Sequence, residues 1–447
     1  MHSSGLLLAL AAPAVYALPY ANSIAAIFRY WEHLGNLTPY WTPDNTPQNL
    51  LSGLPDTCSV DKAFVLVRHA ARHPISGELP AIQTLSSYIN DNAAVFSDPK
   101  TTVPSEFNFL SGWRSTFILN NLTAPGRLEA FTNGVNLKLD YPQLSTNTFL
   151  VGNQDRVVET AQWYIDGYVG RYANFDQQIQ LIGEDSATVS WITPIDTCAN
   201  WTYNSGQVPI TTWGRVYLPR IATRINDLLQ PAYPGVNFTA DNMHGALWAC
   251  AYGDAVNGTG TSPWCSVFLP SEFLDFEYEL DLLMRGAFGY GLPNDQGPVI
   301  GSLLVSNMTM FMLSGSSPSA GANLSVAFGH DTTIDLGMTA LGLLNDTSFP
   351  AEGPPNPARL WRTSRQVPFN AQMVFQRLSC AGAPNSLGTQ ELRIQLLMNG
   401  ANFDLSGVGC RTDKYGTCAF SDFLATPNVR AALAVRHGDA RWTAACG

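Results

Sequence analysis

AFVLVRHAARHP (residues 63–74) joins an apolar, β-branched run to an abrupt polar turn. A continuously apolar run of this length is typical of a strand buried on both faces, as in a parallel sheet. Apolar residues recur at helical spacing after the turn, from Leu79 to about Phe96. The segment therefore predicts a buried strand, a polar turn and a helix in succession.

A second junction of the same kind is LSVAFGHD (residues 324–331). Thr332 and Thr333 are good N-cap residues, and we expect a helix to run on from them to Leu344. Open α/β sheets place their ligand sites outside the carboxyl ends of the strands. The polar residues at the ends of both predicted strands are therefore candidates for a ligand site.

The rest of the chain completes an expected α/β fold. RIQLLMNGANF (residues 393–403) predicts a β-hairpin with an Asn-Gly turn. Residues 161–299 look mostly helical, and residues 18–57, rich in Pro, Asn and Thr, look like an extended arm over the surface. We expect a central, mostly parallel sheet with flanking helices (58–160 and 300–447), and the smaller helical domain inserted over it as a cap.

Composition and charge narrow the possible partners. The 447 residues are 45% hydrophobic and 13% charged, as in an ordered globular protein. The formal net charge of −11 argues against a nucleic-acid partner, because a phosphate backbone would be repelled over most of the surface. Beyond the N-terminal segment, no uninterrupted apolar stretch approaches the roughly 20 residues of a membrane span.

Several features predict secretion. Residues 1–17 contain an apolar run followed by Val15-Tyr16-Ala17, as in a signal peptide cleaved after Ala17. The eight cysteines all follow this segment, and none forms a C-x-x-C pair, so disulfides are a better explanation than a zinc or redox site. Eight N-x-Ser/Thr acceptors predict glycosylation, at Asn36, Asn121, Asn200, Asn237, Asn257, Asn307, Asn323 and Asn345.

The turn Arg68-His69-x-x-Arg72 predicts phosphate chemistry. Guanidinium groups match phosphate oxygens with paired hydrogen bonds, and a neutral imidazole held between them is able to attack phosphorus. An ordinary charged surface turn is the alternative. His330 and Asp331 are candidates for a phosphate donor and a proton donor, although a surface His-Asp pair is commoner. Arg156 is the weakest candidate, since such an arginine usually forms only a salt bridge.

The sequence resembles the histidine acid phosphatase family, which includes fungal phytases, in the order of three elements along the chain. These are RHxxRxP, then an arginine, then His-Asp. Further stretches resemble the same family, from about residue 55 to residue 446. They are Phe276–Leu282 with Gly289-Tyr290-Gly291, Val367 to Cys380, and Cys410 to Cys418 with Phe420 to Phe423.

The resemblance implies a phosphoglycerate-mutase-like fold and hydrolysis of small phosphate monoesters, without a cofactor or metal. It implies that His69 is the nucleophile, which forms a phosphohistidine, and that Asp331 is the proton donor. Phosphate would be held by Arg68, Arg72, Arg156 and His330. The implied disulfides are Cys58–Cys380, Cys198–Cys446, Cys250–Cys265 and Cys410–Cys418.

Two departures from the family pattern bear on activity. Ala70 occupies the position after the nucleophile, where the family usually has Gly, and a methyl there would slow turnover if the turn needs a left-handed conformation. Residues 75–86 contain no lysine, whereas many phytases are basic there. We therefore expect a broad acid phosphatase. The alternatives are a phytase and a catalytically weak phosphate-ester-binding homologue.

Overall fold

Strand β1, Cys58–Arg68, lies in the middle of a large sheet. The structure is a computed structural model that describes residues 28–44, 49–170, 177–314, 323–381 and 391–447. The predicted signal peptide and the first residues of the arm fall outside this range. The strand order is β3-β2-β4-β1-β5-β6-β7, and β8 pairs with β6. The other strands are β2 Thr148–Gly152, β3 Gln178–Ile182, β4 Leu324–Gly329, β5 Gln372–Cys380, β6 Glu391–Met398, β7 Ala401–Phe403 and β8 Cys418–Ala419.

The sheet is mixed. The half from β3 to β1 is parallel, as the apolar runs predict, and the half from β5 to β8 is antiparallel. The predicted hairpin is confirmed: β6 and β7 are joined through Asn399 and Gly400, whose φ angles are 52° and 83°. Positive φ at both turn residues is what the type I′ turn requires, and Asn-Gly favours it.

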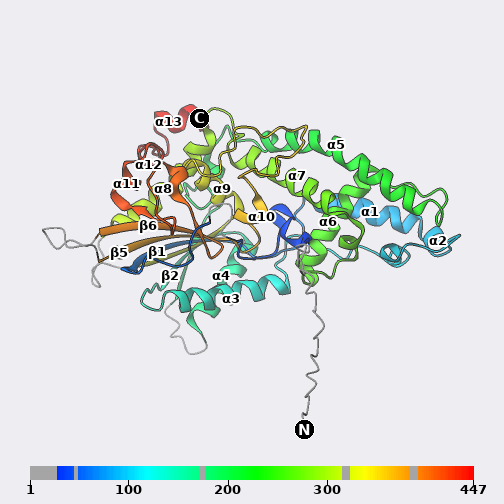
Figure 1. The fold of residues 1–447 in the computed structure, drawn as a ribbon, viewed down its shortest axis with the longest axis horizontal. Coiled ribbons are helices and arrows are strands. Elements are labelled where there is room, and N and C mark those ends of the chain that lie inside the picture. The colour runs from blue at the N-terminus through cyan, green and yellow to red at the C-terminus, as the bar shows by residue number, and fades with distance from the viewer. Residues whose placement is uncertain (1–27, 45–48, 171–176, 315–322, 382–390) are drawn as a thin grey trace, which may run out of the picture.

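The apolar run in β1 is buried on both faces of the sheet. Ala63, Val65 and Val67 pack into the core beneath α3 (Ala124–Asp140) and α4 (Asp155–Val169). Phe64 and Leu66 point to the opposite core, because side chains alternate along a strand. Helices α8 (Gln296–Leu313), α9 (Asp331–Ala340), α11 (Phe420–Ala425) and α12 (Pro427–Leu433) cover that second face (Figure 1).

A helical part with its own apolar core extends from one end of the sheet (Figure 1). It contains α5 (Asn204–Leu229), α6 (Ala240–Asn257) and α7 (Pro270–Phe288), all within the expected cap. The division between the helical part and the sheet differs from expectation at two places. Helices α1 (Leu79–Asp91) and α2 (Ala93–Phe96) join this helical core, because the apolar face of α1 packs on α6. Strand β3, expected in the cap, pairs with β2 at the edge of the sheet.

The shorter elements connect these layers. The remaining α-helices are α10 (Thr363–Gln366) and α13 (Ala440–Cys446). Six 3-10 turns are η1 Tyr30–Glu32, η2 Gly35–Leu37, η3 Ser105–Phe107, η4 Pro194–Thr197, η5 Pro263–Val267 and η6 Leu405–Val408. The predicted N-caps Thr332 and Thr333 are wrong by two residues: α9 begins at Asp331, with His330 as its N-cap, and it ends at Ala340 instead of Leu344.

One stretch of the arm lies in the interior and not on the surface as predicted. Leu34 to Thr38 are buried, and Gly35 packs so closely against α7 that a Cβ there would lie 2.4 Å from Leu280 Cβ. Gly35 also has a φ of +56°, which glycine adopts without strain. Trp41 anchors the far side of this segment by donating from Nε1 to Ser364 O at 2.9 Å. A short stretch of the arm is therefore part of the interior.

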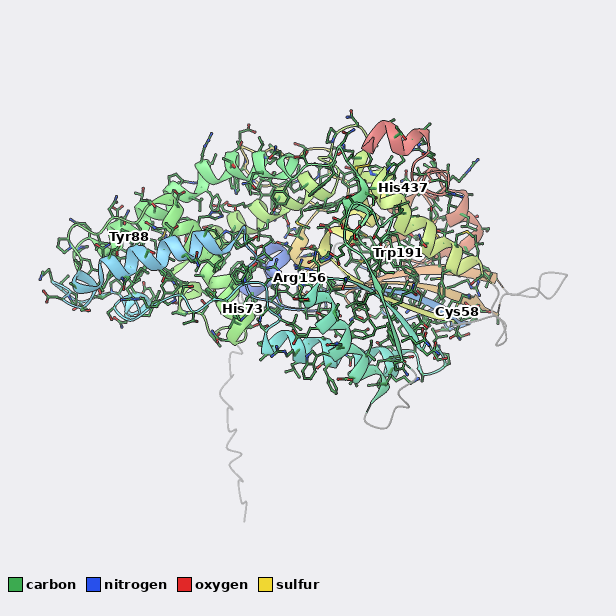
Figure 2. The ribbon with its side chains drawn as sticks, turned by 180° about the vertical axis from the view of Figure 1, so that it is seen from behind. Cys58, His73, Tyr88, Arg156, Trp191 and His437 are labelled. Carbon is green, nitrogen blue, oxygen red and sulfur yellow. A yellow bond between two sulfur atoms is a disulfide. The ribbon has the colours of Figure 1, made fainter. Side chains whose placement is uncertain are left out.

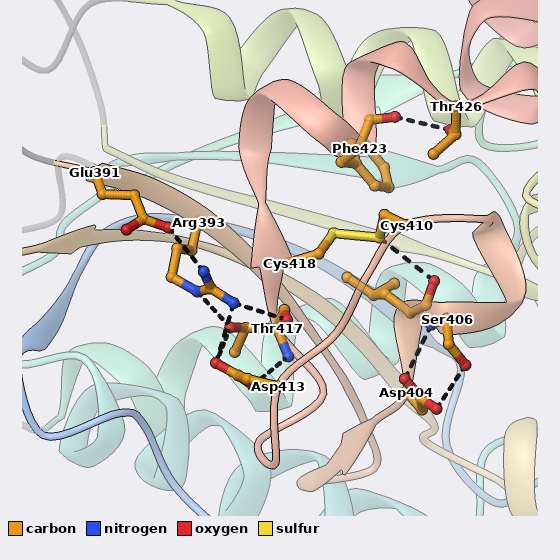
Figure 3. Close-up of a disulfide and its surroundings, with 11 residues drawn as sticks. Glu391, Arg393, Asp404, Ser406, Cys410, Asp413, Thr417, Cys418, Phe423 and Thr426 are labelled. Carbon is orange, nitrogen blue, oxygen red and sulfur yellow. Dashed lines mark hydrogen bonds and ion pairs between the residues drawn. A yellow bond between two sulfur atoms is a disulfide. The ribbon is translucent and has the colours of Figure 1, made fainter.

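Four disulfides join Cys58–Cys380, Cys198–Cys446, Cys250–Cys265 and Cys410–Cys418, the pairings that the resemblance implies. The last closes a loop beside β6, where Arg393 bonds to Thr417 and Asp413 (Figure 3). Since such bridges persist in oxidising compartments, they support the expected secretory environment.

Candidate active site

The parallel half of the sheet brings the predicted site residues to one edge. Arg68, the last residue of β1, is in register with Gly329, the last residue of β4, and His69 donates its backbone N–H to Gly329 O at 3.0 Å. Strand β2 ends beside them and leads into α4, whose second residue is Arg156. Figure 2 shows Arg156 between the sheet and the helical part.

A pocket of about 200 Å³ lies at this edge. Five of the six predicted catalytic and phosphate-binding residues line it: His69, Arg72, Arg156, His330 and Asp331. Apolar and aromatic side chains also line it, among them Ile195, Tyr203, Trp248, Leu283, Met284 and Phe288. The pocket therefore combines charged and apolar side chains.

The surroundings of His69 favour a neutral imidazole, and its Nε2 makes no hydrogen bond to the described residues. Its Nδ1 lies 3.0 Å from Ala70 O, so an imidazole that donates there keeps its lone pair on Nε2. Burial lowers the pKa of His69 well below its usual value, and the nearby positive charges of Arg156 and Arg68 lower it further. The side chain is 2% exposed. Such an imidazole is suited to act as a nucleophile, because the lowered pKa favours its unprotonated form.

Ala70 sits in the turn without backbone strain, because its φ is not in the left-handed region. Its N–H donates to Thr160 Oγ1 at 3.0 Å, and its methyl group packs with Leu122 and Ala130. The conformational reason for a glycine at this position is therefore absent in this chain.

Arg72 and Arg156 are positioned by neighbours that the sequence analysis did not identify. Arg72 pairs with Glu78 at 2.9 Å and donates to Tyr252 OH at 2.8 Å, while Arg156 donates to Asn120 Oδ1 at 3.0 Å. The Nε atoms of both arginines are buried without a hydrogen-bond partner among the described residues. Buried unpaired donors are costly, and phosphate oxygens would satisfy them.

Arg68 differs from the other arginines because it does not line the pocket. It is fully buried, its Nη1 donates to the backbone oxygens of Asn36 and Val367, and its guanidinium lies 4.7 Å from the ring centre of Phe369. Its Nη2 lies 2.9 Å from Asp331 Oδ2. The direct contact of Arg68 in this structure is thus with the predicted proton donor.

His330 and Asp331 stand at the start of α9. His330 Nε2 lies 3.0 Å from Glu184, and its ring centre is 5.6 Å from that of His69. Burial would raise the pKa of Asp331, but Arg68 and a hydrogen bond from Asn36 outweigh it and lower the pKa overall. The surroundings therefore favour the ionised form of Asp331.

Sequence patterns did not identify Asn36, Glu78, Glu184 and Tyr252 as site residues. Asn36, Glu78 and Glu184 line the pocket, and Tyr252 contacts Arg72. Glu78 follows its partner Arg72 closely in the chain, whereas the other three are distant along the chain from their partners. Burial argues against glycosylation of Asn36 in the folded protein, because its Nδ2, the atom that would carry a glycan, bonds inside the protein to Asp331 Oδ2 at 2.9 Å. Of the other acceptors, Asn323 is half-buried and the remaining six are exposed.

The described part of the chain contains neither a candidate metal site nor a candidate membrane span. Over the described ranges, no group of three or more His, Cys, Asp or Glu side chains is arranged to hold a metal ion. Within the same ranges, no helix is both long and apolar enough to cross a bilayer.

Comparisons with known proteins match this geometry. The family model of the histidine phosphatase superfamily (branch 2) matches residues 59–399. A thiamine-repressible acid phosphatase of Schizosaccharomyces pombe is 26% identical over 428 residues, which cover 90% of this chain and 88% of the relative. Phytase A of Arthroderma benhamiae is 24% identical over 457 residues and 94% of each chain. The crystal structure of the phytase from D. castellii shares the fold, with a TM-score of 0.76 at 21% identity over 94% of this chain and 89% of that one.

Proposed function

The chain belongs to the histidine phosphatase superfamily, branch 2, and on that premise we propose that it is a secreted acid phosphatase that hydrolyses phosphate monoesters through a phosphohistidine on His69. The observation that carries the proposal is the buried His69 imidazole, which shares one pocket with two arginines, His330 and Asp331. Acid phosphatases are among its relatives.

The reaction divides into two transfers. In the first, His69 Nε2 forms a bond to phosphorus, the bond to the leaving oxygen breaks, and Asp331 gives its proton to that oxygen. In the second, water attacks the phosphohistidine, the N–P bond breaks, and Asp331 takes a proton from the water. Arg72, Arg156 and His330 stabilise the charge on the phosphoryl oxygens throughout.

Activity in acid follows from the charges around these groups. Asp331 has to be protonated before it can protonate a leaving group, and Arg68 and Asn36 stabilise its carboxylate. A bound phosphate dianion opposes a second negative charge nearby, so substrate binding and low pH together favour the protonated carboxyl. The lowered pKa of His69 keeps that imidazole unprotonated under the same conditions.

The pocket favours a substrate with one phosphate over inositol hexakisphosphate. Glu78, Glu184 and Asp196 line it together with the catalytic Asp331, and no lysine is among its lining residues. Further phosphates on a substrate would meet these carboxylates without enough compensating cations. Phytase is the second candidate because phytases are among the relatives at 23–25% identity. The ratio of kcat/KM for p-nitrophenyl phosphate and inositol hexakisphosphate separates the two functions.

Secretion is supported by the predicted signal peptide at residues 1–17, the exposed sequons and the four disulfides. Expression of the full chain in a eukaryotic host tests this proposal. We expect phosphatase activity in the medium and a loss of apparent mass after enzymatic deglycosylation. Activity retained inside the cells, with no change of mass, would contradict it.

Turnover of p-nitrophenyl phosphate near pH 5 is the direct test of the activity. Acid quenching with 32P-labelled substrate is expected to trap label on His69, and His69→Ala is expected to lose turnover while it still binds inorganic phosphate. His73→Ala is a matched control, because His73 lies in the same loop but does not line the pocket. Label on another residue of a competent enzyme would overturn the nucleophile assignment.

A further inference from the structure

Asn36, from the N-terminal arm, closes a ring of contacts with Arg68 and Asp331. Arg68 donates from Nη1 to the backbone oxygen of Asn36, Asn36 Nδ2 donates to Asp331 Oδ2 at 2.9 Å, and Arg68 Nη2 lies 2.9 Å from the same oxygen. All three side chains are buried. Each member of the ring therefore fixes the position of the next.

The ring makes the two oxygens of Asp331 different. Oδ2 accepts a hydrogen bond from Asn36 Nδ2 and forms an ion pair with Arg68 Nη2, whereas Oδ1 accepts a single hydrogen bond, from the backbone N–H of Thr332 at 3.0 Å. The cation and the amide donor beside Oδ2 disfavour a proton on that oxygen. A proton on this carboxyl consequently resides on Oδ1.

We propose that Asn36 is a positioning residue that holds Asp331 so that Oδ1 carries the proton delivered to the leaving oxygen. The proposal rests on the proposed function, since it presupposes that Asp331 is the general acid. The amide is suited to this role, because it donates a hydrogen bond without adding a charge beside the carboxylate. A second weak contact, from Nδ2 to Met284 Sδ at 3.7 Å, fixes the orientation of the amide.

The arm itself is held firmly enough to deliver Asn36. Thr38 Oγ1 accepts a hydrogen bond from Leu34 N at 3.1 Å, and Phe369 N donates to Thr38 O at 2.9 Å. Gly35 permits the close approach to α7 described above. The segment 34–38 thus acts as a part of the site that comes from outside the two strand–turn motifs.

The test compares two substrates in Asn36→Ala. Loss of a fixed general acid slows a poor leaving group most, so we expect kcat to fall about tenfold or more on glycerol 2-phosphate and less than about threefold on p-nitrophenyl phosphate. Removal of a donor to the carboxylate should also move the alkaline limb of the kcat–pH profile upward by about one pH unit. Asn36→Asp, nearly isosteric, should move it further, because two adjacent carboxylates share one proton.

Trp41→Phe is the matched control, since it removes one anchor of the arm without touching Asp331. It should leave the ratio of the two kcat values and the alkaline limb unchanged. Equal losses on both substrates with an unmoved limb in Asn36→Ala and Asn36→Asp would overturn the proposal. If the wild type itself did not turn over p-nitrophenyl phosphate, the proposed function would fail instead, so the two failures are distinguishable.

Glycopeptide mapping supplies an independent test. Because Nδ2 is both the hydrogen-bond donor and the glycan attachment atom, the active enzyme should carry an unmodified Asn36. A glycan on Asn36 in fully active protein would refute the role of the amide.

Discussion

His69 and Asp331 show how neighbouring charges assign opposite tasks to two buried titratable groups. Cations near His69 disfavour its protonated form, and the same cations favour the ionised form of Asp331. In the proposed mechanism the nucleophile therefore stays neutral, and the acid acquires its proton when a negatively charged substrate offsets the arginines. This arrangement explains how one pocket combines a base-like nucleophile with a general acid.

Asp331→Asn should discriminate between leaving groups. Since a general acid contributes roughly 10²- to 10⁴-fold where protonation is needed, we expect a loss of that order on glycerol 2-phosphate and a much smaller loss on p-nitrophenyl phosphate. Steady-state kcat values for both substrates give the answer. Asp196→Asn removes another carboxylate of the pocket and should change both rates alike. A similar loss on both substrates in Asp331→Asn would mean that Asp331 only orients the site.

Ala70→Gly should destabilise the protein without accelerating it. The position needs no left-handed φ, and the methyl group packs with Leu122 and Ala130, so its removal should cost about 1–2 kcal/mol in free energy of unfolding. Thermal or urea unfolding and kcat on p-nitrophenyl phosphate measure the two effects. A higher kcat at unchanged stability would show instead that the methyl group hinders phosphate.

The first turn of helix α3 packs against the loop that follows β1 and carries His69 and Arg72. Thr123 Oγ1 accepts from Gly126 N at 3.1 Å as the N-cap and donates to Ala71 O at 3.0 Å. Gly126 packs against the same loop, where a Cβ would lie 2.3 Å from Ala71 O. Ala71 lies between His69 and Arg72, so the N-terminus of α3 fixes the backbone that carries both.

Thr123→Ala should therefore affect both stability and catalysis. Loss of the cap is expected to lower the free energy of unfolding by about 1 kcal/mol, and the loosened loop should lower kcat severalfold. Thr123→Ser keeps the hydroxyl and serves as the control, with both quantities close to wild type. Unchanged kcat in a destabilised Thr123→Ala protein would show that the cap matters for folding alone.

Buried ionisable groups make the stability of the whole molecule depend on pH. Burial raises the pKa of Glu129 from 4.5 to about 7, and its Oε2 has no hydrogen-bond partner among the described residues. A carboxyl with a raised folded pKa destabilises the fold progressively as the pH rises from its unfolded value, near 4.5, to about 7. The lowered pKa of His69 acts in the opposite direction, because the unfolded chain takes up its proton below about pH 6.5.

Glu129→Gln isolates one of these contributions. At pH 4 both proteins are uncharged at this position and should have similar stability. At pH 8 the variant should be more stable by on the order of 1–3 kcal/mol, because only the wild type must bury a carboxylate. Thermal unfolding at both pH values measures the difference. Glu352→Gln, at an exposed position, is the control and should show no such divergence. A difference of equal size at both pH values would contradict the assignment.

Local sequence patterns sufficed for the features whose physical cause is local. The apolar run 63–67 predicted a strand buried on both faces, and Asn399-Gly400 predicted a tight hairpin turn. Because β1 and β4 are parallel, the polar residues that follow them lie at the same edge of the sheet. These predictions hold because alternation along a strand and the backbone preferences of Asn and Gly act within a few residues.

Contacts between distant segments were beyond such patterns. The polar arm has no hydrophobic periodicity from which the burial of Asn36 against Asp331 could be predicted. The sequon at Asn36 predicted an exposed position instead. Strand β3 is exposed along most of its length and lacks the apolar run that is typical of a buried strand. Helix α1 belongs to the helical part because its apolar face packs against α6. Burial and charge pairing at these sites depend on which segments meet in three dimensions, and that was settled by packing of the complete chain.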